Sequence, residues 1–76
     1  MSEANTVLAL KNAWNGAVAA SDEVRAAAPT VSGLPEGTSL AELDLDTYDR
    51  LTFAQANAVM ALRGLVEELR RRRESA

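Results

Sequence analysis

Hydrophobic side chains recur at helical spacing through the first third of the chain. Steps of three and four residues separate the members of one series: Val7, Leu10, Trp14, Ala17, Ser21, Val24 and Ala28. This spacing is the a/d pattern of a helix that packs along one seam. Asn5 can cap the start of the helix, and Pro29 should end it because proline lacks an N–H group and restricts the preceding residue. The pattern therefore predicts a helix over residues 4–28.

A second helical series occupies the last third of the chain. Its main stripe is Val59, Leu62, Val66 and Leu69, flanked by Ala58 and Leu65. The segment from Thr52 to Gln55 has the form of a capping box, in which side chains bond to the free N–H groups at a helix start. We therefore predict a helix over residues 52–74. A separate face on its opposite side holds Phe53, Ala56, Met60 and Gly64. The first half of this helix is thus apolar almost all round, which implies that it is covered on two sides.

Residues 29–51 are expected to connect the two helices without a long regular element. Proline and glycine interrupt helices, and they recur here at Pro29, Gly33, Pro35 and Gly37. A capping-box pattern from Ser39 to Glu42 predicts one short helical turn, and Asp46 should cap another over residues 47–51. The segment is too apolar for a free linker, so we expect it to fold back over the helices. Its apolar members are Leu34, Leu40, Leu43, Leu45, Tyr48 and Leu51.

These elements predict an all-α fold in a single small domain over residues 1–76. The expected architecture is a hairpin of two long antiparallel helices with an irregular, partly helical connector. Fifteen alanines and ten leucines, both strong helix formers, favour the same fold class. A chain of 76 residues builds only a marginal core of its own. We therefore expect the hairpin to be part of an oligomeric bundle or of a larger protein assembly.

The apolar helix stripes supply the candidate interface. Trp14 is the single tryptophan, and this residue type is enriched at the centres of protein interfaces. Trp14 is also suited to packing inside the hairpin, and in a small oligomer the two roles merge. One pairing of stripes would form the hairpin, and the remaining apolar surface would form the interface. The candidates on the second helix are Val59, Leu62, Leu65, Val66 and Leu69.

An arginine run near the end of the chain is the most conspicuous polar feature. It comprises Arg70, Arg71, Arg72 and Arg73, and such a run can bind the phosphates of a nucleic acid. A helix turns by about 100° per residue, so the four side chains point in different directions. Glu67 and Glu68 stand four residues before Arg71 and Arg72, which predicts local ion pairs. We prefer a solvated or partner-contacting helix end, with a nucleic-acid-associated helical protein as the alternative.

Charge is distributed unevenly along the chain. Residues 1–51 hold three basic and eight acidic side chains, whereas residues 52–76 hold five basic and three acidic ones. Opposite charges at the two ends would favour head-to-tail contact between copies. Ordinary surface charge is the alternative explanation.

Composition excludes several kinds of chemistry. Without Cys or His, the chain has no disulfide, thiolate nucleophile, Cys/His zinc site or imidazole base. A calcium loop starting at Asp44 would place Tyr48 and Gln55 where EF-hands need oxygen ligands, so Asp46 and Asp49 fit helix capping better. We expect no enzyme, no catalytic or metal-binding residue and no cofactor.

The setting is expected to be cytoplasmic, without a membrane. The first residues are acidic and lack the apolar stretch of a signal peptide, and no run reaches the roughly 20 apolar residues of a membrane span. Abundant alanine, together with arginine at seven of the eight basic positions, indicates a GC-rich coding genome. We therefore expect a non-enzymatic protein-interaction or assembly module, such as an accessory or structural subunit of a bacterial or phage complex.

Overall fold

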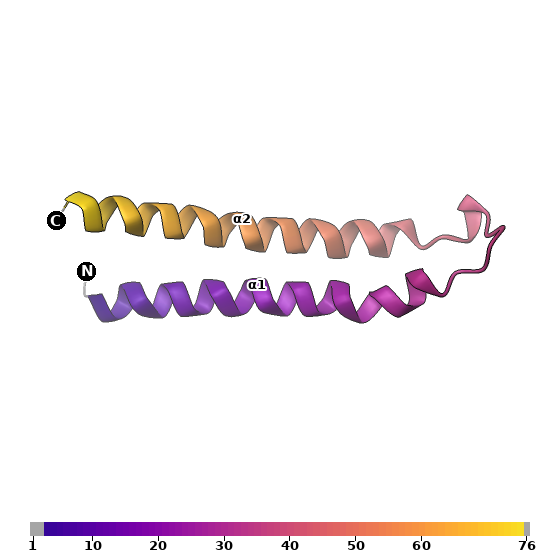
Figure 1. Ribbon diagram of the computed structural model, residues 1–76, viewed down its shortest axis with the longest axis horizontal. Coiled ribbons are helices and arrows are strands. Elements are labelled where there is room, and N and C mark those ends of the chain that lie inside the picture. Colours follow the sequence, from indigo (N-terminus) through magenta and orange to yellow (C-terminus); the bar gives the residue numbers. More distant parts are fainter. Residues whose placement is uncertain (1–2, 76) are drawn as a thin grey trace.

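Two long helices lie side by side in opposite directions and make up almost the whole molecule (Figure 1). The computed structural model describes residues 3–75, in the order α1 (Glu3–Ser32), a short 3-10 helix η1 (Leu40–Glu42) and α2 (Leu45–Ser75). These residues contain no strand, and the molecule measures 58 × 17 × 16 Å. The all-α helical hairpin is therefore confirmed, with both chain ends at one end of the molecule and the connector at the other.

Helix α1 continues past Pro29, so its predicted end at residue 28 is wrong. A proline removes only its own N–H group, and its carbonyl oxygen still accepts a bond from the Gly33 N–H at 2.9 Å. The extra turn lies beside α2, and Ala28 and Val31 line an apolar hollow together with Tyr48. The proline costs little here because it lies within the last turn of the helix. At Gly33, a Cβ atom would come within 3.0 Å of the Pro29 oxygen, so glycine suits the position where the helix ends.

Helix α2 begins at Leu45, seven residues before the predicted start. Its cap is Asp44 rather than Asp46: a carboxylate oxygen of Asp44 accepts a bond from the Thr47 N–H at 3.2 Å. Thr52 lies inside the helix, where its hydroxyl donates to the carbonyl oxygens of Tyr48 at 2.8 Å and Asp49 at 3.2 Å. The predicted capping box at Thr52 is therefore wrong, because a threonine hydroxyl can bond back within its own helix.

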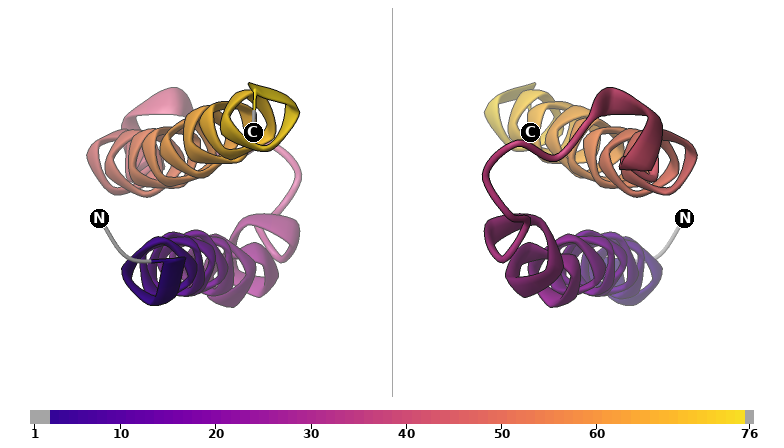
Figure 2. Two further views of the ribbon diagram at one scale, coloured as in Figure 1. Left: turned by 90° about the vertical axis from the view of Figure 1, so that its left-hand side faces the viewer. Right: turned by 90° about the vertical axis from the view of Figure 1, so that its right-hand side faces the viewer.

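The connector is shorter than predicted and spans residues 33–44. Gly37 has a φ of 85°, a left-handed conformation that favours glycine. The predicted turn after Ser39 is present as η1, but within the described chain the Ser39 side chain makes no capping bond. The connector loops across the end of the hairpin from one helix to the other (Figure 2), and Leu40 is 79% exposed. The expectation that this segment folds back over the helices is wrong.

The contact between the helices sets mostly small side chains of α1 against larger side chains of α2, several of them leucines. Ala17 is the most buried of the described residues, at 7% exposure. Ser21 and Gln55 add a polar bond across the contact, with the Gln55 amide donating to the Ser21 hydroxyl at 3.3 Å. The half-buried positions of α1 are Thr6, Leu10, Ala13, Ala20, Ser21, Val24 and Ala27. Those of α2 are Thr47, Tyr48, Leu51, Gln55, Ala58, Leu62, Leu65, Glu68 and Leu69.

The heptad rhythm of the seams is as predicted, and about half of the predicted positions lie in the contact, namely Leu10, Ala17, Ser21, Val24, Leu62 and Leu69. At the other positions the contact is shifted by one residue. In α1, Val7, Trp14 and Ala28 are exposed, and the preceding residues Thr6, Ala13 and Ala27 take their places. In α2, Val59 and Val66 are exposed, whereas the flanking Ala58 and Leu65 lie in the contact. Alanine lets two helix backbones approach closely, and a tryptophan in the contact would hold them apart. On α1 the small residues therefore face α2, and Trp14 is left outside.

Candidate interaction surface

The hairpin exposes much more surface than a compact protein of its size. Its accessible surface is 6157 Å², whereas a compact monomer of this mass exposes about 4,500 Å². The Cα radius of gyration is 17.6 Å, against about 11 Å for a compact domain of this length. The excess is therefore about 1,600 Å², and several of the largest apolar side chains contribute to it.

Trp14 is the largest of the exposed apolar side chains and is 56% exposed. It shares a groove between the helices with α2, and we call this the Trp14 groove. Its lining is Trp14, Val59, Leu62, Arg63, Val66, Glu67 and Arg70. A neighbouring hollow is lined by Leu10, Val66, Leu69, Arg70 and Arg73. Because Val66 and Arg70 line both, the two form one continuous apolar strip that runs toward the chain ends.

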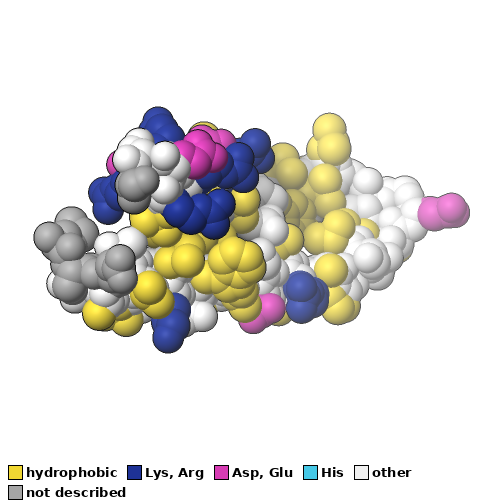
Figure 3. Space-filling view, turned by 60° about the vertical axis from the view of Figure 1, so that its left-hand side comes forward, with side chains coloured by type: hydrophobic (Ala, Val, Ile, Leu, Met, Phe, Trp, Pro, Cys, Tyr) yellow, Lys and Arg dark blue, Asp and Glu magenta, His cyan; other side chains and the backbone are white. Residues whose placement is uncertain are grey.

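The strip combines apolar side chains with guanidinium groups. Figure 3 shows apolar side chains gathered over both helices near the chain ends, with Lys and Arg side chains bordering them. Arg63, Arg70 and Arg73 are the basic members of the strip. A surface of this kind suits a partner with an apolar stripe flanked by acidic groups.

Most of the predicted interface residues meet in this strip. Trp14, Val59, Leu62 and Val66 line the groove itself, and Leu69 lines the adjoining hollow. Leu65 lines neither hollow, and like Leu62 and Leu69 it is half-buried in the contact between the helices. The structure thus places five of the six predicted residues on one surface.

A second apolar hollow lies at the connector end and was missed by the sequence prediction. Its lining is Val24, Ala27, Ala28, Val31, Tyr48, Leu51 and Thr52. The prediction ended the first helix at residue 28 and treated residues 29–51 as a connector, so it did not bring these side chains together. The signal was present in the sequence, since Val24, Ala28 and Val31 continue the steps of four and three beyond the predicted helix end.

Phe53 and Met60 form a third exposed apolar area on α2. Their side chains are 66% and 70% exposed, and neither lines the Trp14 groove. They are seven residues apart, two helix turns, so they share one side of the helix. This side is separate from the contact with α1, as the sequence predicts.

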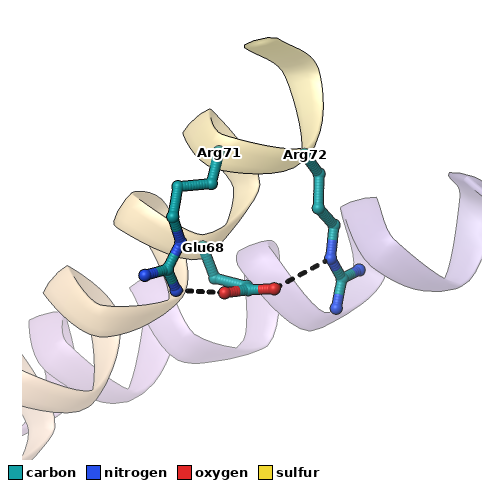
Figure 4. A network of polar contacts seen from close by, with 3 residues as sticks. All are labelled: Glu68, Arg71 and Arg72. Carbon is teal, nitrogen blue, oxygen red and sulfur yellow. Dashed lines mark hydrogen bonds and ion pairs between the residues drawn. The ribbon is translucent and has the colours of Figure 1, made fainter. Parts of the chain in front are cut away.

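The arginine run divides into two pairs with different surroundings. Glu68 accepts bonds from both Arg71 and Arg72 (Figure 4), and the Arg72 contact measures 3.3 Å. The hydrogen bond and positive charge of Arg71, followed by those of Arg72, lower the pKa of Glu68. In the described part of the chain Arg70 and Arg73 form no ion pair, and both line the apolar strip.

The predicted ion pairs are therefore only partly correct. Glu68 pairs with Arg72 as expected, but Glu67 pairs with Arg63 at 3.6 Å instead of with Arg71. Glu68 takes Arg71 as its second partner. The four consecutive arginines thus do not act as one basic face, because a carboxylate already holds two of them.

The remaining polar groups form no other obvious site. Over residues 3–75, no three or more acidic side chains are grouped closely enough to hold a metal ion, and no buried side-chain polar atom lacks a partner. Neither helix, within the same range, is long and apolar enough to cross a membrane. Comparisons with family models, with curated proteins and with solved structures gave no match. The exposed apolar strip is the feature of this surface that calls most clearly for an explanation.

Proposed function

We propose that this protein is a non-enzymatic assembly module that binds protein through its apolar helix faces. The Trp14 groove is the proposed binding surface. A half-exposed tryptophan beside Val59 and Val66 is the observation that supports it. Contiguous exposed apolar patches mark interaction sites in soluble proteins, and tryptophan is the residue type most enriched at their centres.

The exposed area fits this role. A standard protein interface buries about 800 Å² on each partner. The surface in excess of a compact monomer is about twice that amount, so one or two such contacts can be accommodated. We propose an accessory or structural subunit of a bacterial or phage complex, acting in the cytoplasm, as the setting. Its high alanine content and preference for arginine over lysine support this proposed origin.

Nucleic-acid binding through Arg70–Arg73 is the alternative function. Arg70 and Arg73 support it, since no carboxylate of the described chain pairs with them. Against it, Glu68 holds Arg71 and Arg72, and the hollow that Arg70 and Arg73 line is otherwise made of the apolar side chains Leu10, Val66 and Leu69. Protein binding accounts for both the apolar strip and its basic border, so we favour it.

The proposal is tested by photo-cross-linking from the groove in the cells that express the protein. Benzoyl-phenylalanine replaces Trp14 in one variant and the exposed, polar Asn12 of the same helix in a control variant. We expect covalent protein adducts from position 14 and few from position 12. Equal yields from the two positions, or no protein adduct at position 14, would contradict the proposed function.

A shortened chain that ends at Leu69 separates the two functions. Apolar docking should persist in this variant, whereas nucleic-acid binding should be lost. For the full chain, binding to DNA or RNA should weaken steeply as salt rises, because phosphate contacts release counterions. Tight, salt-sensitive nucleic-acid binding that disappears with residues 70–76 would favour the alternative.

A further inference from the structure

We propose that a second copy of this chain covers the Trp14 groove and that the two copies pair face to face in opposite directions. This inference rests on the proposed function and names the partner and its orientation. The contact would be apolar at the centre, around Trp14, Val59 and Val66. The product would be a bundle of four helices, the usual way in which helical hairpins bury a second apolar face.

The level of Trp14 divides the hairpin into two halves. Ser21 and Gln55 are hydrogen-bonded across the helices. Trp14 on α1 and Leu62 on α2 each lie seven residues from this pair toward the chain ends, and both line the Trp14 groove. We call their shared height along the hairpin the Trp14 level. From this level α1 runs on toward the connector, while α2 runs toward the chain ends (Figure 1). Residues before Trp14 and after Leu62 therefore form a terminal half, and residues 15–61 form a connector half.

The two halves carry opposite charge. The terminal half contains six basic and four acidic side chains, which include the arginine run. The connector half contains two basic and seven acidic side chains. Parallel pairing would place each half against its like, whereas antiparallel pairing places the acidic half of one copy against the basic half of the other. Complementary potentials of this kind set the orientation of an interface, and like charges in contact oppose it.

The positions of individual charges along α2 agree with antiparallel pairing. Asp49 precedes Leu62 by thirteen residues, and Arg73 follows Leu62 by eleven. At 1.5 Å per residue these positions lie about 20 Å and about 17 Å from the Trp14 level, on opposite sides. A two-fold axis at this level therefore brings Asp49 of one copy near the height of Arg73 of the other. Arg73 forms no ion pair within the described chain, so it is free for this contact.

The surface available is enough for such a dimer. A stable interface of standard size removes about 800 Å² from each partner. The hairpin exposes about 1,600 Å² more than a compact monomer of its mass. Glu67 of the groove already pairs with Arg63, whereas Arg70 and Arg73 form no ion pair within the described chain. These two arginines suit an acidic partner, and the connector half of the same chain supplies one.

The first test measures mass in solution by light scattering over a range of concentrations. The full chain should reach twice its 8.1 kDa mass as concentration rises. Trp14→Ala should raise the dimer dissociation constant at least about tenfold. The control is Phe53→Ala, which removes an exposed aromatic side chain outside the groove and should change that constant less than about threefold. A chain that stays monomeric up to millimolar concentration, or equal effects of the two variants, would overturn the proposal.

Orientation is tested by a distance between spin labels in the otherwise natural chain. Because the chain has no cysteine, Ser32→Cys provides one labelling site at the exposed end of α1. Ser32 lies eighteen residues from Trp14, so antiparallel copies should hold the two labels about 50 Å apart. Parallel copies would bring them within about 20 Å, since paired helices lie about 10 Å apart. A short distance would overturn the proposed orientation. Because the labelled chain keeps Trp14, this test remains valid even if the Trp14→Ala variant fails to fold.

The outcomes also separate this inference from the proposed function. Cross-links from position 14 to a different protein, with a chain that is monomeric in solution, would reject the second copy and retain the assembly module. Absence of any protein adduct from position 14 would reject both. Cross-links to a second copy, together with the long spin-label distance, would support both.

Discussion

The contact between α1 and α2 and the Trp14 groove differ in the size of their side chains. At the contact, Ala17 is the most buried residue of the described chain. In the groove, Trp14, the largest side chain of the sequence, remains more than half exposed. Small domains usually bury their aromatic side chains, whereas this hairpin leaves Trp14 and Phe53 exposed. The difference indicates that the alanines of α1 serve close approach within the chain, while Trp14 is left for contacts beyond it.

This difference has an energetic consequence. Burying a large apolar side chain contributes about 1.5–3 kcal/mol, whereas alanine removes little area from water. The internal contact of the hairpin therefore contributes a modest share of the hydrophobic free energy that the sequence can supply. Much of the remainder becomes available only when Trp14 and its neighbours are covered. We expect the stability of the chain to rise with the concentration of its partner.

The largest expected effect is at the internal contact, where Ala17→Asp should unfold the hairpin. It places a carboxylate between two closely packed helices and should lower the free energy of unfolding by about 3 kcal/mol or more. Ala19→Asp is the matched control, because Ala19 is exposed on the same helix and shares only the helix-propensity cost of about 0.7 kcal/mol. Urea unfolding followed by circular dichroism measures both variants. Equal losses would mean that the helices do not meet at Ala17.

The next effect should separate the two surfaces by their dependence on concentration. Trp14→Ala should lower the free energy of unfolding by about 2 kcal/mol or more where the chain is associated. Where the chain is monomeric, the loss should be less than about 1 kcal/mol. Leu65→Ala acts at the internal contact and should cost about 1–2 kcal/mol at every concentration. Thermal unfolding at micromolar and millimolar protein tests this pair. A loss for Trp14→Ala that does not depend on concentration would place the tryptophan in the hairpin's own packing.

A smaller gain in stability is expected at the end of α1. Pro29→Ala restores an N–H donor to the helix and should raise the free energy of unfolding by about 1 kcal/mol, less than the full interior penalty because the site is near the helix end. Pro35→Ala is the control, because Pro35 lies in the connector and its replacement restores no helical N–H group. This replacement only makes the unfolded chain more flexible, so it should not raise the free energy of unfolding. Thermal unfolding compares the two. A loss of stability in Pro29→Ala would show that the last turn of α1 depends on the proline ring.

The smallest expected effect concerns the exposed carboxylate of Glu68. Because Arg71 and Arg72 lower its pKa below the ordinary value of 4.5, this group stabilises the folded chain above pH 4.5. That contribution is lost as pH falls through the lowered pKa. Glu68→Gln should therefore have a slightly lower Tm than the natural chain near pH 7, and the two should converge at strongly acidic pH. A difference that grew as pH fell would contradict this assignment.

The helices were predictable from local pattern, but their ends were not. Steps of three and four residues identify both helices before any contact is known. Pro29 and Thr52 misled the prediction at the boundaries. A proline near a helix end removes one bond while the rest of the turn still forms, as the bond from the Gly33 N–H to the Pro29 oxygen shows, and Thr52 bonds within its own helix. Proline and threonine are each compatible with either a helix end or a helix interior, so residue type alone did not place the boundaries.

The candidate surface was predictable in part, because the sequence contains two adjacent stripes on each helix. Ala13 and Trp14 are neighbours, as are Ala58 and Val59, and either member of each pair satisfies the same rhythm. Hydrophobicity favours the larger residue as the packed one. The sequence alone therefore named the apolar residues that matter without saying which of them the hairpin would bury.

The sequence by itself determined an all-α hairpin with a heptad rhythm, an acidic connector half and a basic end. Only the tertiary structure decided which stripe packs inside, because that depends on how closely two helix backbones approach. Alanine permits the closer approach, so α1 meets the leucines of α2 along its small residues. Trp14 then faces outward beside Val59 and Val66, on a surface that a partner can cover.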